Sequence, residues 1–303
     1  MRQRVTAEKG FLIGHIVSMV FGLAGLLLVL PNPEFIAQLP EIGLKAFGLS
    51  MAGGGVVYML LGTIAVILYG LRILGAWQLL TFMASAVCLS LCSELLGTST
   101  GFPFGEYHYL SGLGYKFGGL VPFTIPLSWF YLGCCTFLIA RVGFESLAVP
   151  TWFRWFGAVT MGSVMLTSWD FVLDPAMSQT EVPFWLWDQP GAFFGMPYQN
   201  FAGWMGTGAL FMTVASVLWQ FRPVTLPVNR IGVPLAIYLA NFGFAAIMSI
   251  AGGIYVPVLL GLFFGIGPVL LFYYLGNPGT FFPQGANSAD VNMPVASVGA
   301  AQE

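Results

Sequence analysis

The chain has 303 residues, of which 57% are hydrophobic and 7% are charged, whereas an ordinary soluble domain carries about 25% charged residues. This composition predicts an integral membrane protein. The 10 Lys and Arg residues against 12 Asp and Glu give a net charge of -2, and a chain without a basic field is not expected to bind nucleic acid.

The residues that most often bind metals are scarce and dispersed. His15 and His108 lie far apart in the sequence, and neither has a second imidazole at ligand spacing. The cysteines lie inside apolar runs without a C-x-x-C pair: Cys88, Cys92, Cys134 and Cys135. A structural zinc site needs about four such ligands. We therefore expect neither a protein-bound metal nor a cofactor.

The expected elements begin with a polar segment at residues 1–10, followed by an apolar run. About 20 apolar residues, rising 1.5 Å each, cross the roughly 30 Å hydrocarbon core of a bilayer. The first run exceeds the roughly 7 to 15 residues of a signal-peptide core, so we expect it to remain as a helix. Eight such stretches are predicted, at 11–30, 46–71, 74–96, 120–140, 151–174, 198–220, 232–252 and 254–275.

The distribution of Lys and Arg indicates an orientation, because cytoplasmic loops are enriched in both. With the N-terminus inside, the outer side holds only Lys45 and Lys116. The inner side then holds Arg2, Arg4, Lys9, Arg72, Arg141, Arg154, Arg222 and Arg230. This asymmetry predicts an all-α polytopic bundle of about eight helices, N-in and C-in. Residues 1–276 would form one transmembrane domain, and the Gly-, Pro- and Ala-rich segment 277–303 a disordered cytoplasmic tail.

Two aspartates stand at the end of the fifth apolar stretch. An Asp at the centre of a membrane helix costs roughly 2.5 to 3.5 kcal/mol on insertion scales, so such residues are candidates for function. Asp170 and Asp174 share one helix face, and Pro175 predicts that Asp174 is the last helical or first loop residue. Two poorly solvated carboxylates cannot both ionise cheaply, so the pair would supply an acid and a base. Alternatively, Asp174 caps the loop and Asp170 pairs with polar groups inside the bundle.

A third acid, Glu94, ends the third predicted helix. In the N-in topology helices three and five both run outward, which places Glu94 at the same membrane face as the aspartate pair. The long loops 97–119 and 175–197 lie on that face too, and loops of this length are usually functional when ordered. Glu106, in the first of them, is a further candidate. The alternative is that Glu94 and Glu106 are simply solvated.

Aromatic side chains gather in the same segments. An interfacial belt accounts for many of them, and a minority would line a hydrophobic channel whose ring faces stabilise a cationic intermediate. Asn200, at the start of the sixth helix, could orient a water. The candidates for substrate binding are Trp169, Tyr107, Tyr109, Trp185, Trp187, Phe194, Asn200 and Trp204.

Six motifs lie between residues 93 and 204. They are SELLGT at 93–98, GFPFGEYHY at 101–109, PFTIPLSW at 122–129, DFVLDP at 170–175, W-x-W at 185–187 and GMPYQNFAGW at 195–204. Together they resemble those of the membrane-embedded carotenoid 1',2'-hydratases of bacteria and archaea, which act on gamma-carotene or bisanhydrobacterioruberin.

The resemblance implies an enzyme that adds water across the terminal C1'–C2' double bond of a linear carotenoid end and leaves a tertiary alcohol at C1'. It implies a carotenoid, water, the bilayer and other carotenoid-pathway enzymes as partners, in a bacterial or archaeal cell membrane or in a thylakoid. Our hypothesis for the catalytic groups is Asp170, Asp174, Glu94 and Glu106. Asp170 would donate the proton, and Asp174 or Glu94 would receive one from water.

Two other classes of function stay open. The Asp170-x-x-x-Asp174 pair resembles half of the magnesium-diphosphate site of an isoprenoid prenyltransferase, but such a site also needs a second acidic cluster and Lys or Arg. A carotenoid- or isoprenoid-binding or transport protein would use the acids to couple proton movement.

Overall fold

The computed structural model describes residues 2–179, 183–226 and 230–277 of the chain. Within these ranges eight helices are long and apolar enough to cross a membrane, which confirms the predicted polytopic helical bundle. The predicted tail falls outside the described residues except for Asn277, which is buried and donates a hydrogen bond to the Tyr273 carbonyl at 2.8 Å.

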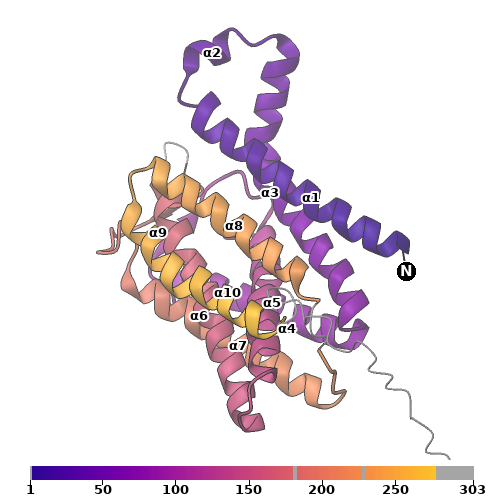
Figure 1. Ribbon diagram of the computed structural model, residues 1–303. Helices are drawn as coiled ribbons and strands as arrows, with labels where there is room; N and C mark the ends of the chain where they lie inside the picture. The colour runs from indigo at the N-terminus through magenta and orange to yellow at the C-terminus, as the bar shows by residue number, and fades with distance from the viewer. Residues whose placement is uncertain (1, 180–182, 227–229, 278–303) are drawn as a thin grey trace, which may run out of the picture.

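The N-terminal helices form a long antiparallel pair. Helix α1 (Arg2–Ala24) continues as the π-helical turn η1 (Gly25–Val29), and a short α2 (Pro33–Ala37) leads into α3 (Glu41–Ile73). The α2 end of this pair projects beyond the other helices (Figure 1). At 1.5 Å per residue the 33 residues of α3 extend about 50 Å, well beyond the bilayer core. The predicted span 46–71 is therefore too short at both ends.

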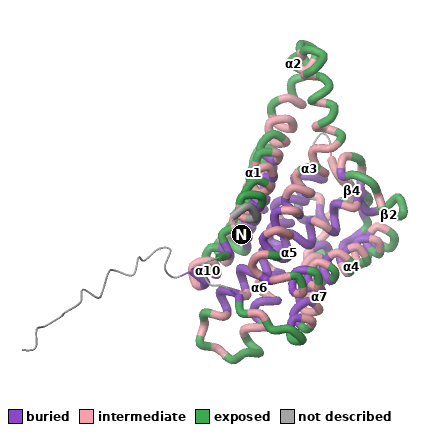
Figure 2. The backbone as a smooth tube through the Cα atoms, turned by 90° about the vertical axis from the view of Figure 1, so that its right-hand side faces the viewer, coloured by how far each residue is buried: buried purple, intermediate pink, exposed green. Residues whose placement is uncertain are grey.

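The core is built around α5 (Thr124–Glu145), which is apolar on all sides and almost entirely buried, as expected for a central helix. Around it stand α4 (Ala76–Thr100), α6 (Thr151–Ser178), α7 (Tyr198–Gln220) and α8 (Gly232–Ala251). The predicted last span is three pieces: α9 (Tyr255–Gly261), the π-helical η2 (Leu262–Ile266) and α10 (Gly267–Leu275). Buried residues concentrate in this bundle, while much of α1 and α2 is exposed (Figure 2).

Two predicted helix ends near the acids are wrong. Helix α6 continues through Pro175 to Ser178, so Asp174 is an internal helical residue. A proline removes only one ladder hydrogen bond, and the Ser178 hydroxyl donates to the Asp174 carbonyl at 2.8 Å, which helps to close the last turn. Helix α4 likewise passes Glu94 and ends where Gly101 adopts a left-handed φ of 78°, a common way to end a helix.

The two long loops contain short strands that the sequence analysis did not predict. Strand β1 (Tyr107–Tyr109) pairs antiparallel with β4 (Trp185–Trp187), and the register places Tyr107 opposite Trp187 and Tyr109 opposite Trp185. Strands β2 (Lys116–Phe117) and β3 (Val121–Pro122) form a second two-stranded sheet. The β1–β4 pair joins the two loops.

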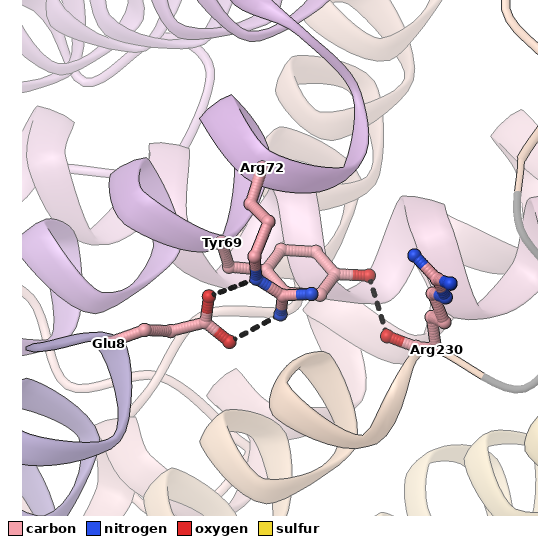
Figure 3. A network of polar contacts seen from close by, with 4 residues as sticks. All are labelled: Glu8, Tyr69, Arg72 and Arg230. Carbon is pink, nitrogen blue, oxygen red and sulfur yellow. Dashed lines mark hydrogen bonds and ion pairs between the residues drawn. The ribbon is translucent and has the colours of Figure 1, made fainter. Parts of the chain in front are cut away.

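Polar contacts join α1 to the bundle at two levels. Near its start, buried Glu8 accepts two hydrogen bonds from Arg72 of α3, at 2.6 and 2.8 Å, beside the Tyr69 hydroxyl that donates to the Arg230 carbonyl (Figure 3). Further along, His15 Nδ1 lies 2.7 Å from the Tyr58 carbonyl. Its Nε2 lies 3.0 Å from the side-chain amide nitrogen of Asn241 in α8. These contacts fix the N-terminal part of α1.

Candidate active site

The β1–β4 pair aims four aromatic side chains at the end of the bundle. Side chains alternate between the two faces of a strand, so the register sends Tyr107, Tyr109, Trp185 and Trp187 to one face. All four carry a hydrogen-bond donor, and all four donate to carboxylates of the bundle. The outer face of β1 carries His108, which pairs with Asp188 at 2.7 Å.

Glu94 of α4 is buried and accepts three hydrogen bonds. The Tyr107 and Tyr109 hydroxyls both donate to Oε2, the latter at 2.9 Å, and Trp129 Nε1 donates to Oε1 at 2.8 Å. A carboxylate that accepts this many donors is stabilised in its charged form. The sequence position of Glu94 suggested a solvated interface as the alternative, but the side chain is enclosed.

Asp170 and Asp174 of α6 are also buried, and Asn200 of α7 bridges them. The Asn200 amide nitrogen lies 2.7 Å from Asp170 Oδ2 and 3.0 Å from Asp174 Oδ2. Asp174 Oδ1 accepts two more bonds, from Trp185 Nε1 at 2.7 Å and Trp187 Nε1 at 3.0 Å. Asp174 thus has three donors and Asp170 one, among the described residues.

Burial raises the pKa of the Tyr107 and Tyr109 phenols well above the usual value, and the negative charge of neighbouring Glu94 raises it further. Both phenols therefore keep their protons at any physiological pH. They act as fixed hydrogen-bond donors and not as bases.

The three carboxyl groups line one partly open cavity, whose space free of protein atoms is about 760 Å³ when its open mouth is included. Its other walls are mostly apolar, and the Trp129 and Trp204 rings stack there with centroids 3.9 Å apart. Trp169 lines it too, and its buried Nε1 has no hydrogen-bond partner among the described residues. No Lys or Arg belongs to the described lining.

The structure brings most of the predicted site residues to this cavity. Those in its walls are Glu94, Tyr107, Tyr109, Trp169, Asp170, Asp174, Trp185, Trp187, Asn200 and Trp204. Glu106 and Phe194 do not belong to them: Glu106 is exposed, and Phe194 is 38% exposed beside Phe193.

Several lining residues were not singled out in the sequence. Trp129 lies within one of the recognised motifs, but only its contact with Glu94 shows what its indole does. Tyr58, Phe184 and Phe244 come from α3, the second loop and α8. An aromatic residue in an apolar stretch gives no signal of its own, so these three could not be found from the sequence.

Metal binding at the site would require several His, Cys, Asp or Glu side chains close together. Among the described residues, no group of three or more His, Cys, Asp and Glu is placed to hold a metal ion. Glu94 and Asp174 direct their oxygens to Tyr, Trp and Asn donors. Their acceptor positions are thus used by the protein.

Fold and site together define a multi-pass membrane protein with an enclosed, aromatic, carboxyl-bearing cavity. Residues 54–268 match the family described as carotenoid biosynthesis protein. The chain belongs to this family, which confirms the family resemblance seen in the sequence.

A curated relative is the bisanhydrobacterioruberin hydratase of Haloarcula japonica, to which the chain is 37% identical over 128 residues. The matched region covers 42% of this chain and 40% of the relative, so the likeness spans about two fifths of the relative's length. No solved structure matches the chain.

Proposed function

We propose that this protein is a carotenoid hydratase that adds water across the terminal C1'–C2' double bond of an acyclic carotenoid end. The main support is that three buried carboxyl groups line one mostly apolar cavity and receive unequal numbers of hydrogen-bond donors. The hydratase named among the relatives supports the reaction class.

The number of hydrogen-bond donors at each carboxyl group supports an assignment of the catalytic acid and base. Hydrogen bonds to a carboxylate favour its charged form. Glu94 and Asp174 each accept three, whereas Asp170 accepts one. Two adjacent carboxyl groups in a poorly solvated place share a proton, so Asp170 holds it and serves as the acid. Asp174, whose carboxylate form has more donors, serves as the base.

Hydration of a trisubstituted alkene then proceeds in two steps. Asp170 donates its proton to C2', a C–H bond forms there, and a tertiary cation remains at C1'. Water attacks C1', and Asp174 takes the proton that the water loses. Transfer of this proton to Asp170 restores the starting state, and the net change is the addition of one water. Stabilisation of the cation at C1' should contribute most to catalysis, because electrostatic stabilisation of a developing charge is usually the largest catalytic contribution.

The aromatic walls stabilise the cation and position the water. A ring face attracts a desolvated cation by about 2 kcal/mol, and the stacked Trp129 and Trp204 offer such faces. The unpartnered Trp169 Nε1 is a buried donor, and a buried donor without a partner is costly. A water or the new hydroxyl in the cavity would satisfy it.

The rival prenyltransferase reaction has less support. Its diphosphate leaving group needs Lys, Arg or a metal to balance its charge. The described cavity walls contain carboxyl groups, neutral donors and rings, without Lys or Arg. An uncharged hydrocarbon suits these walls better.

The test expresses the chain in cells that accumulate gamma-carotene or lycopene. The unaltered chain is expected to give pigments heavier by one water, and Asp170→Asn none, although both reach the membrane. Asp188→Asn changes an exposed aspartate outside the cavity and is the matched control. Product from Asp170→Asn would remove Asp170 from the mechanism, and unchanged pigment with the verified unaltered protein would overturn hydration.

A further inference from the structure

A second cavity adjoins the site. It lies between α1 and α3, and its space free of protein atoms is about 1420 Å³ when its open side is included. Four residues line both cavities: Gly55, Tyr58, Phe184 and Phe244. The second space, here called the α1–α3 groove, is therefore separated from the carboxyl-bearing cavity by no more than these shared residues.

Glycines on two helices form much of the groove. A Cβ added at Gly22, Gly25 or Gly53 would meet no atom within 4 Å, and one at Gly54 would meet only the Ser50 hydroxyl, at 3.6 Å. All four line the groove. At Gly55, in contrast, a Cβ would lie 2.9 Å from the Gly112 carbonyl oxygen. The missing side chains thus keep the groove open up to the point where α3 meets the first long loop.

The groove has the chemistry and the position of a hydrocarbon site. Its described lining contains no charged residue, and Ser18, one of its few polar residues, donates its hydroxyl to the His15 carbonyl. Both helices are apolar enough to cross a membrane. Exposed apolar side chains such as Phe21 and Leu49 belong to its lining. In a bilayer this opening faces lipid chains.

The contacts of α1 limit where the groove opens. The Glu8–Arg72 pair and the His15 contacts hold the N-terminal part of α1 to α3 and α8. The groove residues begin at Ser18, beyond these contacts. The open part of the α1–α3 pair therefore lies toward α2, where both helices leave the bundle (Figure 1).

We propose that the α1–α3 groove binds the extended polyene chain of the substrate while its acyclic end occupies the carboxyl-bearing cavity. The identity of this ligand rests on the proposed function. The substrate enters sideways from the lipid, and Tyr58 and Phe244, whose rings stack at 6.0 Å, stand where the two spaces join. Burial of a long hydrocarbon in an apolar groove is favourable in proportion to its area.

To test this proposal, the groove is filled with a larger side chain. Gly54→Leu places a bulky side chain in the space, and leucine is the better helix former, so the helix is retained. Gly48→Leu is the matched control, because Gly48 also has no atom within 4 Å but is absent from the lining. The purified proteins are titrated with lycopene by absorbance. They are then assayed for hydration of lycopene and of myrcene, a short hydrocarbon with the same isopropylidene end.

Gly54→Leu is expected to weaken lycopene binding at least about tenfold and to lower the ratio of lycopene to myrcene conversion, whereas Gly48→Leu changes neither. Gly22→Leu repeats the test from α1 in case the first variant does not fold. Lycopene binding that is unaffected by both groove variants would overturn the proposal that the α1–α3 groove binds the polyene chain. If the unaltered chain hydrates neither compound but Gly54→Leu still loses lycopene binding, the proposed hydratase function is wrong. The proposal that the α1–α3 groove binds a polyene is then retained.

Discussion

At the scale of single residues, the site depends on how hydrogen-bond donors are shared among acids. Glu94 accepts from two phenols and an indole, and Asp174 accepts from two indoles. Asp170 receives only one amide N–H, which it shares with Asp174. Buried polar groups cost free energy unless they are paired. The three acids should therefore differ in what they contribute to stability.

Replacing each acid by its amide measures this difference. In Glu94→Gln an NH₂ replaces one of the two oxygens that accept from Tyr107, Tyr109 and Trp129, so a donor that the carboxylate satisfied loses its acceptor. A buried donor left unsatisfied costs about 1 to 3 kcal/mol. Asp170→Asn meets one donor and should lose less. Thermal unfolding in detergent is the measurement. Equal losses for the two variants would contradict the assignment of Glu94 as a charged acceptor.

The predicted site residues that the cavity contains share one property: each has a polar group. Asp170, Asp174 and Asn200 could be found in this way, and the cavity contains all three. Tyr58 and Phe244 could not, because their place depends on how α3 and α8 pack. Glu106 was a candidate only by its position in a loop, and the loop turns it outward.

At the scale of elements, the β1–β4 pair does most to build the site. Each strand has only three residues, too short for alternation to be a reliable signal. The sequences Tyr-His-Tyr and Trp-Leu-Trp do alternate, but only the pairing of two distant strands, with Tyr107 opposite Trp187 and Tyr109 opposite Trp185, places their rings on one face. Both strands therefore lie in segments, 97–119 and 175–197, that the sequence predicts as loops.

The contact between α1 and α3 gives a prediction about stability. Glu8 is 2% exposed and Arg72 is 22% exposed (Figure 3). Removing one partner of a buried pair leaves an uncompensated charge at a cost of about 3 to 5 kcal/mol. We expect Arg72→Met to destabilise strongly and Glu8→Gln/Arg72→Met to recover much of the loss, as measured by unfolding in detergent.

The exposed Lys45–Glu41 pair is the control for this prediction. It joins two residues within α3, and both side chains are mostly solvated, so Lys45→Met should change stability by less than about 1 kcal/mol. Purely additive effects of the Glu8 and Arg72 substitutions would show that the pair does not couple α1 to α3.

At the scale of the whole molecule, we propose that both termini of the bundle face the cytoplasm and that the site lies near the opposite face. Helices α4 and α6 both run toward the cavity. Of the two cations assigned to the outer side, Lys116 donates to the carbonyl of the cavity residue Tyr109 at 2.6 Å, and Lys45 lies near the start of α3. This assignment depends on the positive-inside rule.

Labelling tests the orientation. Ser111 is an exposed loop residue, and Ser111→Cys in a background without exposed Cys88 and Cys92 should react with a membrane-impermeant thiol reagent in intact cells. The background protein without the new cysteine is the control. Labelling that appears only after the membranes are broken open would reverse the orientation.

The eight spans were predictable because a stretch of about 20 apolar residues has few other fates. Their limits were not, since α3 extends beyond the bilayer and α6 passes through Pro175. The separation of the last span into α9, η2 and α10 also leaves no mark in hydropathy. Where a helix continues depends on how it packs against its neighbours, and hydropathy does not show this packing.

The origin of the product oxygen tests the central claim most directly. Membranes that contain the protein are incubated with lycopene in water labelled with heavy oxygen and deuterium, and the product is analysed by mass spectrometry. Acid-catalysed addition of water predicts heavy oxygen in the new hydroxyl and deuterium at the adjacent carbon, and no product from Asp170→Asn. A hydroxyl that carries oxygen from air, or a product without deuterium at that carbon, would contradict hydration by these carboxyl groups.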